Sequence, residues 1–444
     1  MRKRMSGKGE VQESLRSKGI EPGDSVEVTS ADGRIVRGIL MPHHEFSGEE
    51  IVTIKLESGY NVGVHPGSSK DIELVSKSDK GSMQIGMNKI ATSSVDSGKN
   101  DKDLPKLSIV STGGTIASYV DYRTGAVKPV VSADELARSI PELFQFCSPR
   151  TEVLYSVLSE NMRPENWKNL AEKVAEHLNG GSAGCIVPHG TDTMGFTAAA
   201  LSFSLSNLTG PVVMVGSQRS SDRPSSDSKM NLMSAARLAI DSDLAEVVVL
   251  MHSTTDDTSC SVHRGTRIRK CHSSRRDAFE SVNEPPIGFV QDGKVFIERA
   301  HDERKTGKVL ADVKFDDEVA LIQFYPGLTP SKFRKSVDGS RGVVVSGTGL
   351  GHTHQEIIPL IADLTNDGIP VCMTTQCIWG STNLNVYSTG RDMLTAGAIP
   401  LGDMLSETAY VKLSWVLGHT SDMKKIREMM LTNMKREMEE RRFL

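Results

Sequence analysis

The spacing of hydrophobic residues changes along the chain and predicts a small β module, a linker and a larger α/β region. Residues 21–75 contain short runs in which apolar and polar positions alternate, as in half-buried β-strands. Asp32-Gly33 and Ser58-Gly59 separate such runs, and glycine-containing pairs of this kind favour hairpin turns. Roughly four or five short strands within about 55 residues indicate a small, closed β-barrel. Residues 76–106 carry only isolated hydrophobic positions among Ser, Lys, Asp, Gly and Asn, which is typical of a linker.

Beyond the linker, apolar runs of strand length alternate with stretches of helical periodicity, and this alternation predicts a parallel sheet. Strand ends that carry Gly, Thr and Asp lie where an open α/β sheet places its ligands. A second, smaller α/β block begins near residue 319, and Ile426, Met430 and Met434 recur at helical spacing after it. We therefore expect an N-terminal extension over 1–75 with its barrel at about 21–75, a linker over 76–106, a larger lobe over 107–300, a smaller lobe over 301–420 and an amphipathic helix over 421–444.

Composition and charge narrow the possible classes of function. The chain has 444 residues, 38% of them hydrophobic, which suits two or three globular domains. A net charge of −4 excludes a strongly basic nucleic-acid binder at the level of the whole chain. No apolar run approaches the roughly 20 residues that span a bilayer, and the N-terminus lacks the apolar segment of a secretory signal. Six cysteines without a CxxC pair make no disulfide scaffold, so we expect a cytoplasmic protein.

The first stretch with chemical character is STGGTIAS at 111–118, which directly follows a predicted strand. Its glycines let the backbone turn tightly and approach a ligand closely. It is neither a Walker loop nor a dinucleotide-binding fingerprint, because it lacks the Lys-Ser/Thr pair and the third glycine. Taken alone, the stretch also fits an ordinary strand–turn–helix corner.

Two further stretches contain candidate nucleophiles and bases. VPHGTDTM at 187–194 holds Thr191, whose hydroxyl needs a base to become nucleophilic, and Asp192, which can orient a substrate amine or a base. The alternative to a catalytic role is that both residues serve at the N-cap of a helix. Arg264 to Arg276 contains six cations and no acid before Asp277, and such like charges would disfavour the ammonium form of Lys270. The alternative for this third stretch is a solvated loop.

Together, TGGTIAS and HGTDTM resemble both signature motifs of the L-asparaginase family, in the right order and about 75 residues apart. More narrowly, the chain resembles the asparaginase-like subunits of archaeal tRNA-dependent amidotransferases, which carry an N-terminal β-barrel extension. The family resemblance covers Leu104 to Gly418 and the narrower one nearly the whole chain. It implies a two-lobed α/β fold with a parallel sheet in the larger N-terminal lobe and a smaller C-terminal α/β lobe, preceded by a small all-β barrel.

The resemblance also implies roles for individual residues. Thr115 matches the first catalytic threonine and is assisted by a tyrosine, for which Tyr122 is the best candidate. Thr191, Asp192 and Lys270 match a proton relay. The residues alone do not distinguish which threonine attacks first, and we favour Thr115, with N–H groups of the Gly113-Gly114 turn as oxyanion donors. Substrate binding falls to Gly114, Ser159, Glu160 and Gly190, where Glu160 departs from the glutamine that many family members carry.

By the same resemblance, the chain is expected to be a glutaminase that forms a threonine acyl-enzyme and passes ammonia to a partner protein, GatE. That partner uses ATP and Mg²⁺ to convert Glu-tRNA(Gln) to Gln-tRNA(Gln), while this chain binds no cofactor and touches the tRNA only through the partner. A homodimer core within a heterotetramer is also implied, without contact to a membrane. Leaked ammonia would be wasted, so hydrolysis should be slow without the partner and charged tRNA.

Three alternatives remain open at this point. A free-standing L-asparaginase/glutaminase would have no need of the first 100 residues, and a degenerate binding protein would not need all four catalytic residue types. A zinc site from Cys260, His263, Cys271 and His272 matches no standard spacing, and its thiolates would compete with the surrounding cations for space. We therefore expect no metal.

Overall fold

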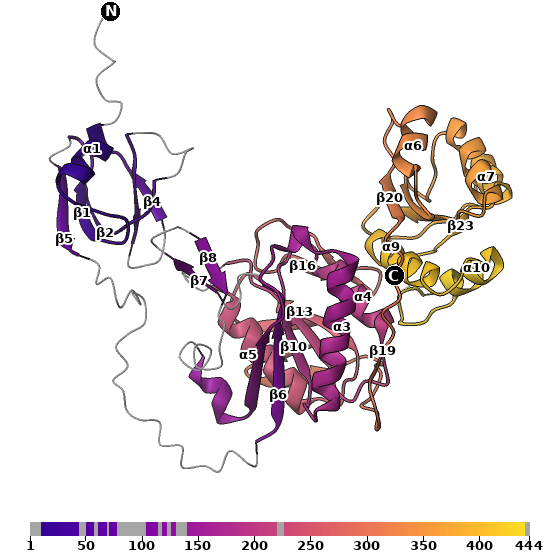
Figure 1. Cartoon of the computed structure of the whole chain (residues 1–444), viewed down its shortest axis with the longest axis horizontal. Helices are drawn as coiled ribbons and strands as arrows, with labels where there is room; N and C mark the ends of the chain where they lie inside the picture. The colour runs from indigo at the N-terminus through magenta and orange to yellow at the C-terminus, as the bar shows by residue number, and fades with distance from the viewer. Residues whose placement is uncertain are drawn as a thin grey trace, which may run out of the picture. The chain divides into compact units, whose positions relative to one another are not determined.

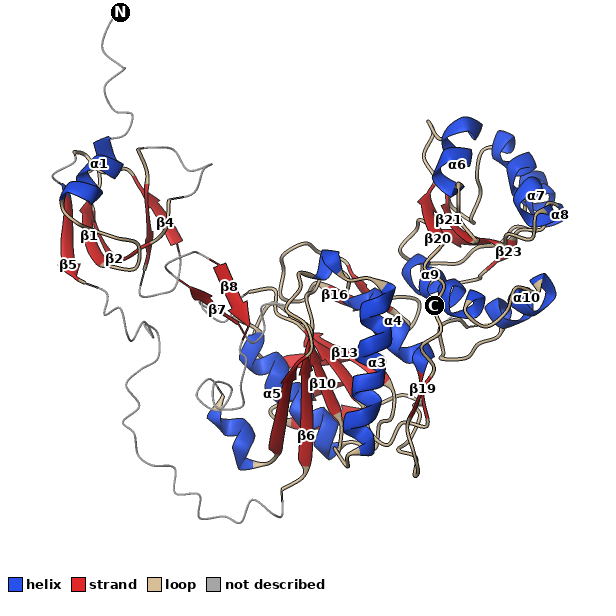
Figure 2. Cartoon of the chain, in the orientation of Figure 1, coloured by secondary structure: helices blue, strands red, loops and turns tan. Residues whose placement is uncertain are grey.

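The computed structural model describes residues 10–43, 50–56, 61–68, 71–77, 104–113, 118–121, 126–129, 140–219 and 226–439 (Figures 1 and 2). The chain forms two compact units. The first comprises residues 1–102, 117–130 and 219–226, and the second comprises residues 103–116, 131–218 and 227–444. The linker expected over 76–106 falls largely outside the described residues.

The first unit is built around an antiparallel sheet of five described strands in the order β4-β3-β2-β1-β5. Asp32-Gly33 forms the predicted turn between β1 and β2, where Thr29 pairs with Ile35 and Gly33 has a φ of +83° that suits glycine. An isolated bridge from Ser30 to Pro66 joins the end of β1 to the residues after β4. No ladder between β4 and β5 is seen in the described part, so the closed barrel stays a prediction. The unit contains α1 (Glu10–Ser17), β1 (Ser25–Thr29), β2 (Ile35–Leu40), β3 (Val52–Lys55), β4 (Asn61–Val64), β5 (Ile72–Ser76) and the paired strands β7 (Ser118–Asp121) and β8 (Ala126–Pro129).

The larger lobe of the second unit is centred on a sheet in the order β18-β17-β14-β13-β12-β10-β6-β9. The strands from β9 to β13 in this order run parallel, as predicted, and each following neighbour pair, β13 with β14, β14 with β17 and β17 with β18, is antiparallel. Figure 2 shows α3 and α4 on one face of this sheet and α5 on the other. The central strands β10, β12 and β13 are buried along their whole length, which explains their continuous apolar runs. The lobe contains β6 (Lys106–Ser111), β9 (Ser148–Val153), α3 (Pro164–Asn179), β10 (Cys185–Pro188), α4 (Met194–Ser204), β11 (Leu205–Ser206), β12 (Val212–Val215), α5 (Ser228–Asp241), β13 (Val247–His252), β14 (Ser259–Arg264), β15 (Ile268–Lys270), β16 (Phe279–Ser281), β17 (Gly288–Gln291), β18 (Lys294–Ile297) and β19 (Leu310–Ala311), with short 3-10 turns at Pro141–Gln145 and Ser159–Asn161.

The smaller lobe is a parallel sheet in the order β20-β21-β22-β23 with helices on both faces. Phe333 of α6 and Ile361 of α7 pack on one side, and Leu413 of α9 and Ile426 of α10 pack on the other. Aromatic contacts such as Trp167 with Phe315 join the two lobes. The lobe contains β20 (Val319–Gln323), α6 (Pro330–Val337), β21 (Gly342–Gly347), a 3-10 turn (Gln355–Ile357), α7 (Ile358–Asn366), β22 (Val371–Thr375), α8 (Ser388–Thr395), β23 (Ile399–Pro400), α9 (Ser406–Leu417) and α10 (Met423–Leu431).

The C-terminal helix is shorter than the expected 421–444, because α10 ends at Leu431 and residues 432–439 continue without helical structure. The side chain of Lys412 explains the ending. Its Nζ donates to the backbone oxygens of Met430 and Thr432, where a continuing helix would need those carbonyl groups for its own next turn. No helix among the described residues is long and apolar enough to cross a membrane.

Lys412 and Glu437 form a fully buried ion pair with Nζ and Oε1 2.5 Å apart. Burial lowers the pKa of Lys412, although the Glu437 charge acts against that shift. Removing only the cation leaves a buried carboxylate without its counter-charge. We therefore expect Lys412→Met to reduce the free energy of unfolding by about 3–5 kcal/mol.

Guanidinium unfolding at neutral pH measures this cost. The matched double variant Lys412→Met/Glu437→Gln should recover a substantial part of it, because no net charge is then buried. Equal stability of the single variant and the parent chain would contradict the assignment.

Candidate active site

The site is built at the carboxyl end of β10, where the strand gives way to the turn Gly190-Thr191-Asp192 before α4. The bland alternative of an N-cap role for Thr191 or Asp192 is wrong, because Thr193 occupies the cap position of α4. Even Thr193 does not cap the helix with its side chain. Its hydroxyl instead donates to the Ser159 carbonyl oxygen at 2.7 Å.

Lys270 reaches this turn from a different element, the last residue of β15. Its Nζ lies 2.8 Å from Thr191 Oγ1 and 2.9 Å from Asp192 Oδ1. The Lys270 side chain is 14% exposed and that of Asp192 is 66% exposed, so the contact faces solvent on the carboxylate side. A hydroxyl, an amine and a carboxylate thus stand in hydrogen-bonded order, which is an arrangement that activates a hydroxyl nucleophile or a water.

The first motif enters the site beside the second one, because β6 and β10 are parallel neighbours. Thr112 donates to the Pro188 carbonyl oxygen from both its backbone N and its Oγ1, each at 3.1 Å. Gly113 has a φ of +112°, and a Cβ there would lie 2.5 Å from the Val157 backbone oxygen, so only glycine fits. Three of the predicted site residues, Gly114, Thr115 and Tyr122, lie outside the described residues.

The predicted substrate-binding residues around Ser159 adjoin the same turn. Ser159 is buried, and a Cβ on Gly190 would lie only 2.7 Å from the Ser159 Cβ. Gly190 is therefore required by this close approach. Glu160, next to Ser159, is exposed. The structure thus brings Ser159, Gly190, Thr191, Asp192 and Lys270 together, with Glu160 at the edge.

The arginine-rich stretch around Lys270 is a solvated loop in one part and not in the other. Residues 264–268 are buried, whereas residues 272–275 are exposed and lie outside any strand. Acids pair with its arginines, and Asp403 and Glu407 among them come from distant parts of the chain. Arg264 and Arg267 are buried, and Arg267 Nη1 lies 2.9 Å from Asp403 Oδ2. The ion pairs are Arg264 with Glu246 and Glu284, Arg267 with Asp403, Arg269 with Glu407, Arg275 with Asp277 and Arg276 with Asp257.

His189 is a site residue to which sequence analysis assigned no role. Its Nδ1 lies 2.7 Å from the Gly190 carbonyl oxygen, which can only accept, so Nδ1 carries the hydrogen. Its Nε2 then accepts from Thr197 Oγ1 at 2.9 Å, and Trp167 Nε1 donates to the same Thr197 oxygen. This chain of hydrogen bonds ties the turn at residues 190–192 to α4 and α3. The sequence pointed to this role only through the presence of a histidine at the end of an otherwise apolar strand.

The four residues of the zinc alternative do not converge as ligands. Cys260 Sγ donates to Asn231 Oδ1, and His263 Nδ1 lies 2.9 Å from Ser281 Oγ. Within the described ranges, no group of three or more His, Cys, Asp or Glu side chains has a geometry that could hold a metal ion.

Comparison with known proteins agrees with this geometry. The family model of the asparaginase N-terminal domain matches residues 106–303, and the glutaminase/asparaginase C-terminal domain model matches residues 318–430. The structure of the thermostable L-asparaginase from Thermococcus kodakarensis superposes with a TM-score of 0.68 at 32% identity, covering 75% of this chain and 99% of that one. Fold and site therefore define an asparaginase-class protein.

The remaining N-terminal part identifies the branch of that class. The GatD N-terminal domain model matches residues 20–75. The D subunit of glutamyl-tRNA(Gln) amidotransferase from Pyrococcus furiosus is 48% identical over 429 residues, covering 95% of this chain and 96% of its own length. The corresponding protein of Thermococcus kodakarensis is 49% identical over 432 residues, with 96% of each chain covered. The chain belongs to the GatD family, the D subunits of glutamyl-tRNA(Gln) amidotransferases.

The buried, neutral His189 makes stability depend on pH. Burial lowers the pKa of His189 from 6.5 to about 4, and the hydrogen bond to Gly190 opposes that shift only partly. The unfolded chain therefore takes up a proton near pH 6.5 that the folded chain refuses until about pH 4. The neutral, buried His189 therefore contributes fully to the free energy of unfolding above pH 6.5. We expect that free energy to fall by about 3 kcal/mol as the pH drops from 6.5 to 4.

Denaturant unfolding at several pH values in this window, with the parent chain and His189→Asn, measures the effect. The variant lacks this titration, so its stability should fall less steeply. Parallel pH profiles for the two proteins would show that His189 does not contribute.

Proposed function

We propose that this chain hydrolyses the side-chain amide of glutamine and supplies the ammonia to a partner protein that amidates Glu-tRNA(Gln). The contact of Lys270 Nζ with Thr191 Oγ1 at 2.8 Å and Asp192 Oδ1 at 2.9 Å carries the proposal, because it joins a hydroxyl, an amine and a carboxylate. The curated relatives of nearly full length are named as D subunits of this amidotransferase, which supports the choice of substrate.

In the proposed mechanism, the Thr115 oxygen attacks the amide carbon of glutamine with assistance from Tyr122. The tetrahedral intermediate expels ammonia, which takes up a proton as it leaves, and an ester joins Thr115 to the glutamyl group. Water then cleaves the ester, which releases glutamate and restores the threonine hydroxyl. N–H groups of the Gly113-Gly114 turn stabilise the oxyanion of both steps.

Thr191, Lys270 and Asp192 serve as the proton relay of these steps. An unprotonated Lys270 can accept the Thr191 hydrogen across their 2.8 Å contact, and the Asp192 carboxylate stabilises the ammonium that forms. Ser159, Glu160 and the backbone at Gly114 and Gly190 hold the amino-acid end of glutamine. The close packing of Ser159 on Gly190 supports this placement.

The activation of tRNA belongs to a second protein in this proposal. In this proposal the partner, GatE, uses ATP and Mg²⁺, and this chain binds no cofactor. The sequence contains no Walker-type phosphate loop, which agrees with this division. We further propose a cytoplasmic heterotetramer built on a homodimer of this chain. The N-terminal extension, the linker, the two lobes and the C-terminal segment are its functional divisions.

Variants of the relay test the hydrolytic function. We expect Thr115→Ala, Thr191→Ala, Asp192→Ala and Lys270→Ala each to abolish glutamine hydrolysis, with losses of at least about a hundredfold in kcat. Release of glutamate by the chain in complex with its partner is the measurement, and asparagine as substrate measures the amide preference.

Lys173→Ala is the matched control for the lysine. Lys173 lies on α3, where it pairs with Glu176 and Glu152, and its loss should leave kcat unchanged. Near-parental rates in the Lys270 or Thr191 variant would overturn the proposed relay.

Coupling to the partner is tested with the parent chain. Since free ammonia would be lost to solvent, we expect glutamine hydrolysis by the isolated chain to be about tenfold or more slower than in the presence of the partner and Glu-tRNA(Gln). Equal rates under the two conditions would remove the coupling and favour a free-standing amidohydrolase.

A further inference from the structure

Lys270 lies on a hairpin that is separate from the main sheet. Among the strands that the structure describes, β15 and β16 pair with each other and with no third strand, through Ile268 with Ser281 and Lys270 with Phe279. A two-stranded ribbon of three residues per strand is marginal by itself. Its position therefore depends on the burial of Ile268 and Phe279 in the core of the larger lobe and on the contacts at its base. The base consists of Thr266 and Arg267 before β15 and Val282 and Asn283 after β16.

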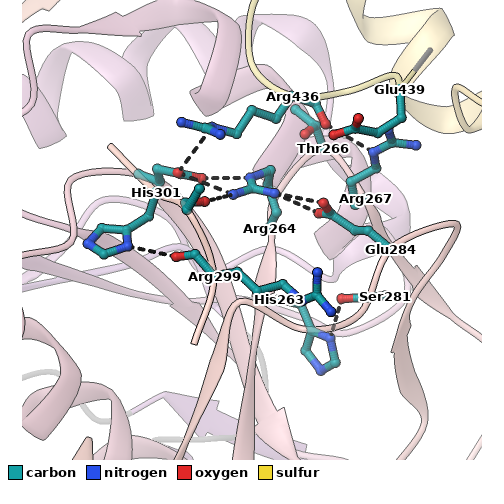
Figure 3. Close-up of polar contacts among 12 residues, drawn as sticks. His263, Arg264, Thr266, Arg267, Ser281, Glu284, Arg299, His301, Arg436 and Glu439 are labelled. Carbon is teal, nitrogen blue, oxygen red and sulfur yellow. Dashed lines mark hydrogen bonds and ion pairs between the residues drawn. The ribbon is translucent and has the colours of Figure 1, made fainter. Parts of the chain in front are cut away.

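The C-terminal segment 432–439, which we name the strap, crosses this base. Thr266 Oγ1 donates to the Lys435 carbonyl oxygen at 3.0 Å, and Arg267 Nε donates to the Arg436 carbonyl oxygen at 3.0 Å. Figure 3 shows Thr266 and Arg267 directed at the chain near Arg436 and Glu439. The strap lies beyond residue 430, where the asparaginase C-terminal family model ends.

The strap is itself held to the smaller lobe. The Glu437 carboxylate is fully buried and accepts from Lys412 Nζ on α9 at 2.5 Å. The same carboxylate also accepts from the backbone N–H groups of Met434 and Lys435. These bonds fix the strap backbone at the point where its carbonyl groups meet the hairpin base.

The smaller lobe also holds the base directly. Arg267 Nη1 lies 2.9 Å from Asp403 Oδ2, and both side chains are buried. Asn283 Nδ2 donates to the Asp403 carbonyl oxygen at 2.9 Å, and Thr408 Oγ1 donates to the Thr266 carbonyl oxygen at 2.8 Å. The Glu439 backbone N–H donates to Asp403 Oδ1, so the strap and this loop brace each other.

We propose that Thr266 and Arg267 are positioning residues for Lys270, and that the strap is the brace against which they hold its hairpin. The geometry that requires such a brace is the 2.8 Å contact of Lys270 with Thr191, which lies on the turn after β10. A displacement of the hairpin by a fraction of an ångström lengthens that contact and slows proton transfer, while the glutamine-binding residues stay in place. The inference rests on the proposed role of Lys270.

Thr266→Val tests the inference with a small change, because valine keeps the shape of the buried side chain and loses only the hydroxyl. We expect kcat for glutamine to fall about tenfold while KM stays within about twofold. Thr266→Ser restores the hydroxyl and should restore kcat. Assays of the chain with its partner run well below the melting temperature of each variant, so that lost stability does not appear as lost rate.

Thr365→Val is the matched control, since Thr365 Oγ1 donates to the Ala396 carbonyl oxygen at 2.6 Å within the smaller lobe and away from the hairpin. It should lower the melting temperature and leave kcat unchanged. In the Lys270→Ala background, Thr266→Val should reduce the residual rate no further, because a positioning residue acts through the group it positions.

The outcomes separate this inference from the proposed function. If Lys270→Ala retains glutamine hydrolysis, the proposed function and the inference that rests on it are both overturned. If Lys270→Ala is inactive and Thr266→Val keeps the parental kcat, only the inference is overturned. It is also overturned if Thr266→Ser fails to recover the rate, or if Thr365→Val loses as much kcat as Thr266→Val.

Discussion

The proposed function depends on one contact, the approach of Lys270 Nζ to the Thr191 hydroxyl. The two residues lie on separate elements, one on the turn after β10 and the other at the end of a short hairpin strand. The Thr191 side is fixed by burial, because β10 is fully buried and His189 bonds the turn to α4. The Lys270 side is a two-stranded ribbon, which Ile268 and Phe279 anchor in the core of the larger lobe and whose base is bonded to the smaller lobe.

The cations around Lys270 show how chain segments are joined here. A run of six cations in sequence suggests repulsion, yet Arg264 and Arg267 are buried against Glu246, Glu284 and Asp403. A buried guanidinium is tolerable only when a carboxylate offsets its desolvation, so each pair fixes two chain segments relative to each other. Arg264 and Arg267 therefore act as ties between chain segments.

Much of the fold was predictable from the sequence, and the limits have a physical cause. The strands at β6, β10, β12 and β13 were found because burial on both faces leaves continuous apolar runs, and the site motifs follow because parallel strands end at one edge. The acid partners of the arginines were not predictable, since Arg267 and Asp403 are 136 positions apart. Local periodicity also predicted a longer C-terminal helix, and Lys412 from α9 overrode it by binding the last carbonyl groups.

The contacts at the hairpin base are polar, and this affects how precisely they can hold Lys270 near Thr191. Apolar side chains can slide and repack by a few tenths of an ångström at little cost, because dispersion contacts have no preferred direction. The bonds of Thr266 and Arg267 to two successive strap carbonyl groups admit a much narrower range of geometries. Buried polar pairs contribute less to the free energy of unfolding than apolar packing of equal volume. Here their angular preference fixes the orientation of the hairpin base. The proposed relay, which uses the 2.8 Å contact of Lys270 with Thr191, gains more from direction than from added stability.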